Sequence, residues 1–230
     1  MSPPWRVEEQ WGTVAELHAR SYALIGPDGP DPLTRRLRVL HATNRGVVLG
    51  SAQPDSDIDG PRARAAGLEV VRRRTGGGAV LVGPGQVLWI DVIVPRGDEL
   101  WTDDVGQAFW WLGDLWVDAL DCAGRCGAQV WRGGLQRRVW TRLVCFAALG
   151  PGEVTIANRK VVGMAQRRTR RGALFQCALP IVWDPVPLLD VLVLSDHQRR
   201  LAATELAGVA MGVGAEAASA ARAVLVDRLP

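Results

Sequence analysis

Lysine is nearly absent from the sequence. The 230 residues include 27 lysines and arginines, and lysine occurs at position 160 alone, so the other 26 are arginines. A compact ammonium and a broad, planar guanidinium differ in reach, shape and hydration, so a site built for one can reject the other. The retained ammonium makes Lys160 a candidate catalytic residue. The alternative is that a single lysine survived by drift in a chain that otherwise uses arginine.

Long apolar runs and dense cysteines are missing as well. The longest apolar stretch, residues 87–95, is interrupted by Asp91 and is too short to span a bilayer as a helix. Residues 1–10 lack the cationic start and apolar middle of a signal peptide. Four cysteines are too sparse for a disulfide scaffold, and Cys122 and Cys126 have no histidine cluster nearby to complete a zinc site. These features predict a cytoplasmic protein with reduced thiols, no membrane association and no bound metal.

Neither sign of charge dominates the chain. The formal net charge is +3, 48% of the residues are hydrophobic and 22% are charged, which is the balance of a folded globular protein. Arginine runs occur at residues 72–74 and 167–171, but nucleic-acid binding is not expected from so weak a signal. No repeat or long linker divides the chain, and its length suits one α/β unit. We expect residues 1–230 to form a single domain, with residues 195–230 as a C-terminal helical segment.

Helical periodicity is expected in four places. The first helix begins near Val14, and the second follows Thr102, whose hydroxyl is the predicted N-cap. The third begins at Ser195, because this serine and the glutamine three residues later have the spacing of a capping box. The fourth covers residues 215–228.

Branched and apolar runs between these helices predict strands. Residues 79–82 and 87–94 flank a Gly-Pro-Gly turn and are expected to form a buried β-hairpin. Residues 157–159 form another turn, from which Lys160 enters a strand. Further strands are expected at residues 37–41, 47–51, 68–74, 129–132, 142–147, 154–156, 161–166 and 173–182.

Two segments contain residues that suggest chemistry. Residues 73–79, Arg-Arg-Thr-Gly-Gly-Gly-Ala, join a basic strand end to three glycines, whose backbone N–H groups can approach an anion or an acyl carbonyl closely. The spacing fits neither a P-loop nor a dinucleotide-binding loop, and by itself it also fits a plain turn between strands. Residues 158–166 read Asn-Arg-Lys-Val-Val-Gly-Met-Ala-Gln and contain Lys160.

Together the two segments resemble the lipoate-protein ligase, octanoyltransferase and biotin ligase superfamily. The first is similar to the family's Arg-Arg-x-Ser/Thr-Gly-Gly-Gly-Ala-Val loop, and the second to its Gly-Arg-Lys-x-x-Gly-Ser-Ala-Gln strand pair. Glu153 falls where the family usually has Asp or Glu. The resemblance covers roughly residues 68–185. It implies an α/β (α+β) fold in which helices flank a mixed, largely antiparallel sheet, with the glycine loop and the lysine facing one acyl-binding cleft.

The resemblance also implies roles for individual residues. In the family, the matching lysine donates to the acyl carbonyl and, in ligases, to the acyl-adenylate phosphate, so this role passes to Lys160. A donor at that place is valuable because negative charge develops on the carbonyl oxygen. The implied substrate-binding residues are Arg74, Thr75, Gly76, Gly77, Gly78, Glu153, Gly163 and Ala165.

Cys145 resembles the nucleophile of one branch of this family. The octanoyltransferases that resemble ligases place a Cys-Phe pair fifteen residues before the lysine, and Cys145-Phe146 has this spacing to Lys160. A thiol there can take the acyl chain as a thioester. The alternative is a buried cysteine that acts as a small hydrophobe, and this packing role is favoured for Cys177.

Several positions depart from the family pattern. Leu81-Val82 replaces Tyr-His after the glycine loop, Met164 replaces a small polar residue, and residues 176–179, Gln-Cys-Ala-Leu, replace Gln-His-Gly-Ser. The missing histidines imply an altered substrate or a loss of catalysis. The histidines that the chain does have lie outside the matched motifs and are expected to be surface or capping residues: His18, His41 and His197.

The activity that the resemblance implies is transfer of an octanoyl or lipoyl group to a lysine of a lipoyl carrier domain or a glycine cleavage H-type protein. In one interpretation, an acyl carrier protein supplies the acyl group, Cys145 carries it and no cofactor is needed. In another, a ligase uses ATP and Mg²⁺ and forms an acyl-adenylate. A catalytically silent relative that binds an acyl group or a carrier protein is the third. Biotin is less favoured, because the glycine-arginine signature of biotin ligases is missing.

Overall fold

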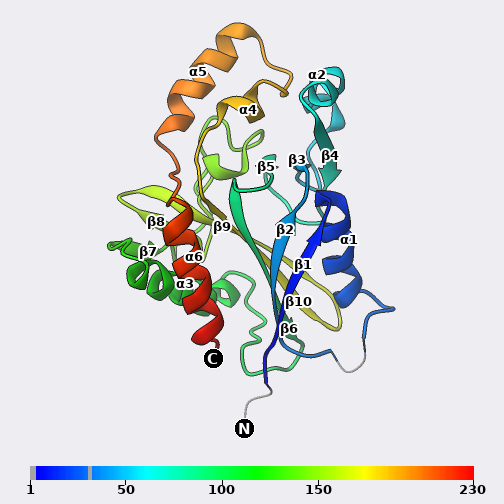
Figure 1. The fold of residues 1–230 in the computed structure, drawn as a ribbon, viewed down its shortest axis with the longest axis vertical. Coiled ribbons are helices and arrows are strands. Elements are labelled where there is room, and N and C mark those ends of the chain that lie inside the picture. Colours follow the sequence, from blue (N-terminus) through cyan, green and yellow to red (C-terminus); the bar gives the residue numbers. More distant parts are fainter. Residues whose placement is uncertain (1–3, 31–32) are drawn as a thin grey trace.

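A seven-stranded sheet runs through the centre of the molecule (Figure 1). The computed structural model describes residues 4–30 and 33–230, and over these the sheet has the order β1-β2-β6-β10-β9-β8-β7. β1 is parallel to β2 and the other neighbouring pairs are antiparallel, so the sheet is mixed and largely antiparallel, as predicted. Its strands are β1 (Arg6–Gly12), β2 (Arg36–Ala42), β6 (Val87–Pro95), β7 (Ala128–Val130), β8 (Val154–Ile156), β9 (Arg159–Arg168) and β10 (Gly172–Pro180).

A second, three-stranded sheet has the order β4-β3-β5. Its strands are β3 (Arg45–Leu49), β4 (Leu68–Arg72) and β5 (Val80–Val82). The predicted β-hairpin between residues 79–82 and 87–94 is wrong, because β5 pairs with β3 whereas β6 lies between β2 and β10. The near-continuous apolar run of β6 accounts for the difference. A strand that is buried on both faces is typical of the middle of a sheet, where neighbours occupy both of its edges.

Helices cover both faces of the main sheet (Figure 1). α1 (Val14–Ile25) lies on one face, and α3 (Trp110–Cys122) and α6 (Ala215–Asp227) lie on the other. α5 (Asp196–Ala207) begins at the predicted capping box of Ser195. Among the described residues, no helix combines the length and hydrophobicity needed to cross a membrane. The shorter elements are α2 (Gly60–Ala65), α4 (Val186–Leu189) and the 3-10 turns η1 (Asp55–Asp57), η2 (Gln107–Phe109) and η3 (Cys145–Ala147).

The start of α3 differs from the prediction. Thr102 is not its N-cap, because Oδ1 of Asp104 accepts hydrogen bonds from the backbone N–H groups of Gly106 at 2.8 Å and Gln107 at 2.9 Å. The 3-10 turn η2 then precedes α3. A carboxylate accepts the free N–H groups of a helix start as well as a hydroxyl does, and Asp104 is two residues nearer to them.

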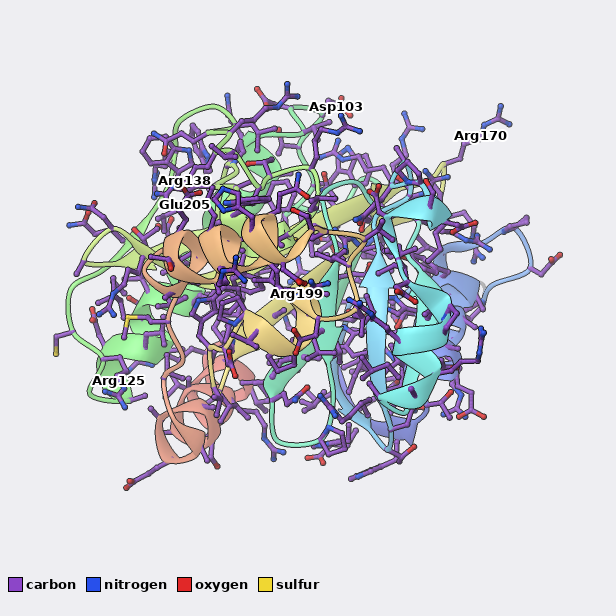
Figure 2. The ribbon with its side chains drawn as sticks, turned by 90° about the horizontal axis from the view of Figure 1, so that it is seen from above. Asp103, Arg125, Arg138, Arg170, Arg199 and Glu205 are labelled. Atoms are coloured by element: carbon purple, nitrogen blue, oxygen red, sulfur yellow. The ribbon has the colours of Figure 1, made fainter. Side chains whose placement is uncertain are left out.

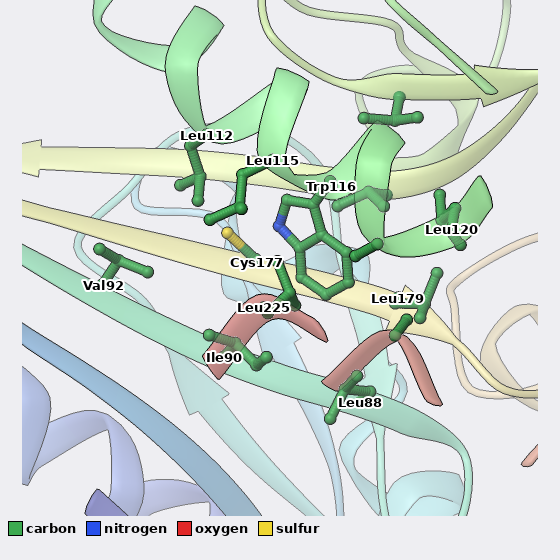
Figure 3. Close-up of a cluster of buried hydrophobic side chains, with 14 of the residues drawn as sticks. Leu88, Ile90, Val92, Leu112, Leu115, Trp116, Leu120, Cys177, Leu179 and Leu225 are labelled. Atoms are coloured by element: carbon green, nitrogen blue, oxygen red, sulfur yellow. The ribbon is translucent and has the colours of Figure 1, made fainter. Parts of the chain in front are cut away.

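The two faces of the main sheet bury different kinds of side chain. Toward α3 and α6 the strands present apolar residues, and these bury Trp116 of α3 completely (Figure 3). Toward α1 the buried residues Arg38, Asp91 and Gln176 lie in register across β2, β6 and β10. Successive residues of a strand point to opposite faces, so β10 contributes Cys177 to the apolar face and Gln176 to the polar one.

Candidate active site

Cys145 opens the turn η3 beside the glycine loop. Its backbone N–H donates to the carbonyl of Ala79 at 2.9 Å, and the N–H of Ala79 donates to the carbonyl of Leu143 at 2.8 Å. The predicted strand at residues 142–147 is nevertheless wrong. The glycine loop bends at Gly77 and offers no extended partner beyond this bridge, so the chain coils into η3. The coil leaves the Cys145 side chain half-buried at the loop.

The glycines allow the loop and the Cys145 segment to approach each other. Gly77 has a φ of +95°, a conformation that residues with a Cβ rarely adopt. A Cβ added to Gly78 would lie 2.5 Å from the backbone nitrogen of Val144, so any side chain there would force the two segments apart. The close contact therefore depends on residues without side chains.

Arg73 links the glycine loop to the thiol. Its side chain is buried, and Nη2 donates to the carbonyls of Gly76 at 2.6 Å and Gly78 at 2.9 Å and to Sγ of Cys145 at 3.6 Å. Nε donates to the carbonyl of Gly76 at 3.2 Å and Nη1 to that of Val48 at 3.2 Å. Each of its three nitrogens is thus engaged within the protein. Sequence reasoning did not assign Arg73 to the site.

The predicted residue Arg74 lies on the outside of the loop. It is exposed, its guanidinium carbon is 5.1 Å from the ring centroid of Tyr22, and its backbone N–H donates to the Tyr22 hydroxyl at 2.7 Å. Thr75 is buried. In the described part of the chain, the backbone N–H groups of residues 76–78 donate to no protein acceptor, so they are available to an anion or an acyl oxygen.

Lys160 is buried and all of its ammonium hydrogens have acceptors. Nζ lies 2.7 Å from Oε1 of Glu153 and donates to the carbonyls of Cys145 at 3.3 Å and Ala148 at 3.1 Å. The ring centroid of Phe146 is 4.9 Å away. Two backbone N–H groups, at 2.7 and 3.0 Å, hold the Glu153 carboxylate. Lys160 therefore clamps the backbone of η3.

A cavity of about 60 Å³ adjoins Cys145. Its walls are mostly apolar, and the predicted residues Gly163 and Ala165 form part of them. Lys160 does not line this cavity, because it lies behind Phe146 and Gly163; a Cβ on Gly163 would be 3.2 Å from Cε of Lys160. The structure thus places the thiol and these two residues of β9 together and sets the lysine on the far side of the wall.

The cavity also contains His18 of α1 and Gln176 of β10, which sequence reasoning did not assign to the site. Nε2 of Gln176 lies 3.2 Å from Nδ1 of His18. Burial and, secondarily, the positive charge of Arg73 lower the pKa of His18 to about 3, so its imidazole is neutral at neutral pH. The predicted surface or capping role of His18 is wrong. Its position one turn after Val14 and one turn before Tyr22, on the apolar face of the helix, was the available signal.

Asp91 lies beside Gln176 in the polar row. It is fully buried, and Nε1 of Trp89 donates to its Oδ1 at 2.8 Å. Burial raises the pKa of Asp91 to about 6, although hydrogen bonds and the charge of Arg38 act in the opposite direction. Burial likewise lowers the pKa of Arg38. Behind Gln176, the sheet therefore buries an acid and a base whose ionisation is costly, and the ion-pair partner of Arg38 is Glu8 of β1, with 3.4 Å between Nε and Oε2.

The two central cysteines have contrasting surroundings. Cys177 is fully buried and points toward Trp116 among apolar side chains (Figure 3). Burial raises the pKa of its thiol to about 12, which agrees with the predicted packing role. Cys145 is half-buried and receives the hydrogen bond from Arg73. All four cysteines are free, and the remaining two are exposed.

A groove of about 640 Å³ lies on the outer side of the glycine loop, where Gly77 lines it. In the described part of the chain, none of the guanidinium groups in this groove has an ion-pair or hydrogen-bond partner, so they are available to an anion. The segment that carries them is anchored on α5 by Trp140, whose Nε1 donates to Oε2 of Glu205 at 2.6 Å. Figure 2 shows Arg138 near Glu205, which is a residue of this helix. The arginines of the groove are Arg137, Arg138 and Arg142.

Comparisons of the sequence with known proteins give a consistent result. A family model described as the lipoyl protein ligase A/B catalytic domain matches residues 28–215. The octanoyltransferase LipM of Exiguobacterium sibiricum is 28% identical over 188 residues, which cover 77% of this chain and 66% of the relative. The LipM of Clostridioides difficile is 27% identical over 166 residues, which cover 70% of this chain and 60% of the relative. The chain thus spans less than two thirds of the length of either relative.

Solved structures share the fold. A bipartite lipoate protein ligase from Thermoplasma acidophilum, described with its E2 lipoyl domain, matches with a TM-score of 0.75 and 19% identity over 98% of this chain and 82% of that one. A lipoate-protein ligase A bound with ATP matches with a TM-score of 0.64 and 21% identity over 99% and 95% of the two chains. At these identities the likeness concerns the fold alone, and it agrees with the predicted architecture.

Proposed function

Because the chain belongs to the lipoyl protein ligase A/B catalytic domain family, we propose that residues 1–230 act as one catalytic domain that transfers an octanoyl or lipoyl group to a lysine of a lipoyl carrier domain. The observation that carries this proposal is the place of Cys145, a half-buried thiol beside an apolar cavity with Nη2 of Arg73 3.6 Å from its sulfur. Apolar walls next to a nucleophile suit the first methylene groups of an acyl chain, and a whole octanoyl chain requires this cavity of about 60 Å³ to widen. The octanoyltransferase relatives and the lipoyl-domain partner of the archaeal ligase support it.

In this proposal Cys145 carries the acyl group as a thioester. Its sulfur bonds to the acyl carbonyl carbon, the bond from that carbon to the thiol of an acyl carrier protein breaks, and the proton of Cys145 leaves with the carrier thiol. The amine of the target lysine, on a lipoyl domain or a glycine cleavage H-type protein, then attacks the Cys145 thioester. An amide forms and the proton returns to the sulfur, so no ATP is consumed.

Lys160 acts on the same turn in this proposal. At present its charge is shared between Glu153 and the carbonyls of Cys145 and Ala148, which fixes the backbone from which the thiol projects. The role implied by the family, donation to the acyl carbonyl, requires that an acyl oxygen replace one of these three acceptors. An oxygen that gains negative charge during the reaction is a stronger acceptor than a neutral carbonyl, which favours such an exchange.

The ATP-dependent ligase is the second candidate, and the arginine groove is the observation that favours it. Unpaired guanidinium groups beside the free N–H groups of the glycine loop suit phosphate oxygens. Asp57, which also lines the groove, offers a carboxylate to a phosphate-bound Mg²⁺. The same groove suits the phosphate of the prosthetic arm on which an acyl carrier protein holds its thioester, so ATP dependence has to be measured directly.

The test is intact-protein mass spectrometry of the wild type and Cys145→Ser. Each is incubated with octanoyl acyl carrier protein, and separately with octanoate or lipoate plus ATP, Mg²⁺ and a lipoyl domain. We expect a hydroxylamine-labile octanoyl adduct on the wild type without ATP and none on Cys145→Ser. Lipoyl-domain modification that needs ATP and proceeds in both proteins would instead identify a ligase.

Two controls make the result specific. A variant with Cys122→Ser and Cys126→Ser removes the exposed thiols and is expected to keep the adduct. Cys177→Ser tests the buried thiol and is expected to keep it too. If the wild type binds octanoyl acyl carrier protein but gives neither an adduct nor a modified lipoyl domain under either condition, the protein is a catalytically silent relative.

A further inference from the structure

The hydrogen-bonding capacity of His18 in the cavity is incompletely used. Nδ1 faces Gln176, but Nε2 has no hydrogen-bond partner within residues 4–30 and 33–230. The other donor-bearing side chains of the cavity wall are engaged elsewhere. Nε1 of Trp89 donates to Asp91 at 2.8 Å, and each nitrogen of Arg73 donates within the protein. Nε2 of His18 is therefore the nitrogen that the protein leaves for a ligand.

A directional chain of hydrogen bonds determines which nitrogen of His18 carries the proton. The backbone N–H of Arg74 donates to the Tyr22 hydroxyl at 2.7 Å, and this hydroxyl donates its hydrogen to Oε1 of Gln176 at 2.9 Å. The amide oxygen is thus committed to Tyr22, which turns Nε2 of Gln176 toward Nδ1 of His18 at 3.2 Å. An amide NH₂ is a donor only. Nδ1 must accept, and the neutral imidazole carries its hydrogen on Nε2.

The environment holds this imidazole neutral and in place. The side chain is buried and the positive charge of Arg73 opposes protonation, which together lower the pKa of His18 to about 3. The ring stacks on Tyr22 with 5.9 Å between centroids and lies against Trp89 with 4.6 Å between centroids. Asp91, the nearby acid, is turned to Trp89 rather than to the imidazole. The result is a preorganised donor with little freedom to reorient.

We propose that Nε2–H of His18 donates to the carbonyl oxygen of the acyl group bound in the cavity and stabilises the negative charge on that oxygen as the thioester forms and breaks. The inference rests on the proposed acyl transfer at Cys145. His18, Cys145 and Gln176 line one cavity, whereas Lys160 can join His18 at the same oxygen only by exchanging one of its three protein acceptors. A fixed donor is most effective where water is excluded and charge develops.

The tautomer is tested independently of activity by two-bond ¹H–¹⁵N spectra of protein labelled with ¹⁵N-histidine. With three histidines in the chain, His41 and His197 serve as more exposed reference signals. We expect His18 to carry its proton on Nε2, and not on Nδ1, at every pH from about 5 to 9. Tyr22→Phe releases the amide of Gln176 and is expected to mix the two tautomers. A wild-type proton on Nδ1 would overturn the inference.

Contact with the substrate is tested in the same spectra. A ketone analogue of the octanoyl thioester, which cannot be transferred, is added to the wild type. We expect the Nε2–H resonance of His18 to shift while those of His41 and His197 stay unchanged. An unshifted His18 signal at saturating analogue contradicts the proposed contact, whatever the activity of any variant.

The catalytic contribution is tested with His18→Phe, which keeps a planar ring and removes the donor. We expect transfer from octanoyl acyl carrier protein to fall about 100-fold in kcat, with little change in KM for the carrier. His197→Phe, at an exposed position on α5, is the matched control and is expected to keep the wild-type rate. Equal kcat in folded His18→Phe overturns the inference and leaves the proposed function intact. A wild type without any transfer overturns both.

Discussion

The two faces of the main sheet are made by the same strands, but within residues 4–30 and 33–230 only the face toward α1 has a buried polar row among its apolar residues. The face toward α3 and α6 is closed by apolar side chains around Trp116. The face toward α1 buries Arg38, Asp91 and Gln176 in one row and opens into the cavity beside Cys145. Burying polar groups costs free energy unless they are hydrogen-bonded. The first face therefore stabilises the fold, and the second gives up stability for a site with defined donors and acceptors.

α1 supplies hydrogen-bond partners for the buried polar row. The hydroxyl of Ser21 accepts from Nη1 of Arg38 at 2.6 Å, and the hydroxyl of Tyr22 donates to Gln176 at 2.9 Å. Neither α3 nor α6 has to provide such partners, because their side of the sheet presents no comparable row. Substitutions beside the cavity are therefore expected to change the rate of acyl transfer. Substitutions on the face toward α3 and α6 are expected to change the free energy of unfolding and to leave the rate unaltered.

The largest expected effect separates the two cysteines. Cys145→Ala is expected to reduce acyl transfer by about 1,000-fold or more, because loss of a nucleophile removes the covalent route. Cys177→Ala is expected to keep the rate and to lower the free energy of unfolding by about 1 kcal/mol, because it leaves a small cavity against Trp116. Transfer rates and urea unfolding of the two variants provide the measurement. Equal losses of transfer rate would contradict the division between the faces.

A smaller effect is expected from the pH dependence of stability. Burial raises the pKa of Asp91 from 3.8 to about 6, so the folded protein binds more protons than the unfolded chain in this window. Its contribution to stability is therefore lost as the pH rises through the window, on the order of 3 kcal/mol. The Asp91→Asn variant lacks this loss. Between pH 4 and 6 the change in its free energy of unfolding should therefore be more positive than that of the wild type, by about 3 kcal/mol.

His18 provides the opposite slope and serves as the matched comparison. Its pKa is lowered from 6.5 to about 3, so the folded protein binds fewer protons than the unfolded chain between these values. Its contribution is complete above pH 6.5 and is lost as the pH falls. His18→Phe should thus make the same curve less steep. Urea unfolding of both variants at several pH values measures how the free energy of unfolding changes with pH. If both variants deviate from the wild-type slope in the same direction, the two groups are not buried as described.

The smallest expected effect concerns the apolar face alone. Ile90 is fully buried toward α3 and α6, on the strand that carries Asp91 on its other face. Ile90→Val is expected to lower the free energy of unfolding by about 1 kcal/mol through loss of one buried methyl group. Transfer by the folded protein should stay the same. A change in kcat without a change in stability would show that the two faces are coupled.

Local sequence signals predicted much of the fold. The capping box of Ser195, the helix from Val14 and the turn before Lys160 are found where periodicity and turn residues place them. Each depends on residues that are close in the sequence. The wrong strand predictions depend on partners far away: β5 and β6 belong to separate sheets, and residues 142–147 coil because their neighbour bends at Gly77.

The residues of the candidate site also fall into two groups: those found from local motifs and those that only distant contacts reveal. The glycine loop, Lys160 and Cys145 were found from motifs, because their spacing along the chain is distinctive. Arg73 was overlooked beside Arg74, since neighbouring arginines in a strand end differ only in the face to which they point. For His18, helical spacing signalled burial on α1, but no local feature indicated that its Nδ1 faces a glutamine 158 positions away.

The sequence by itself determined the family, most of the longer strands and helices, and which residues are candidates for the chemistry. These follow from composition, period and motif, which are properties of neighbouring positions. The tertiary structure alone decided which groups meet. It placed Lys160 behind the cavity wall, brought Arg73 within hydrogen-bonding distance of the thiol and packed His18 against Gln176. Sheet register and helix packing set these distances, because a buried donor can function only where the fold has placed its acceptor.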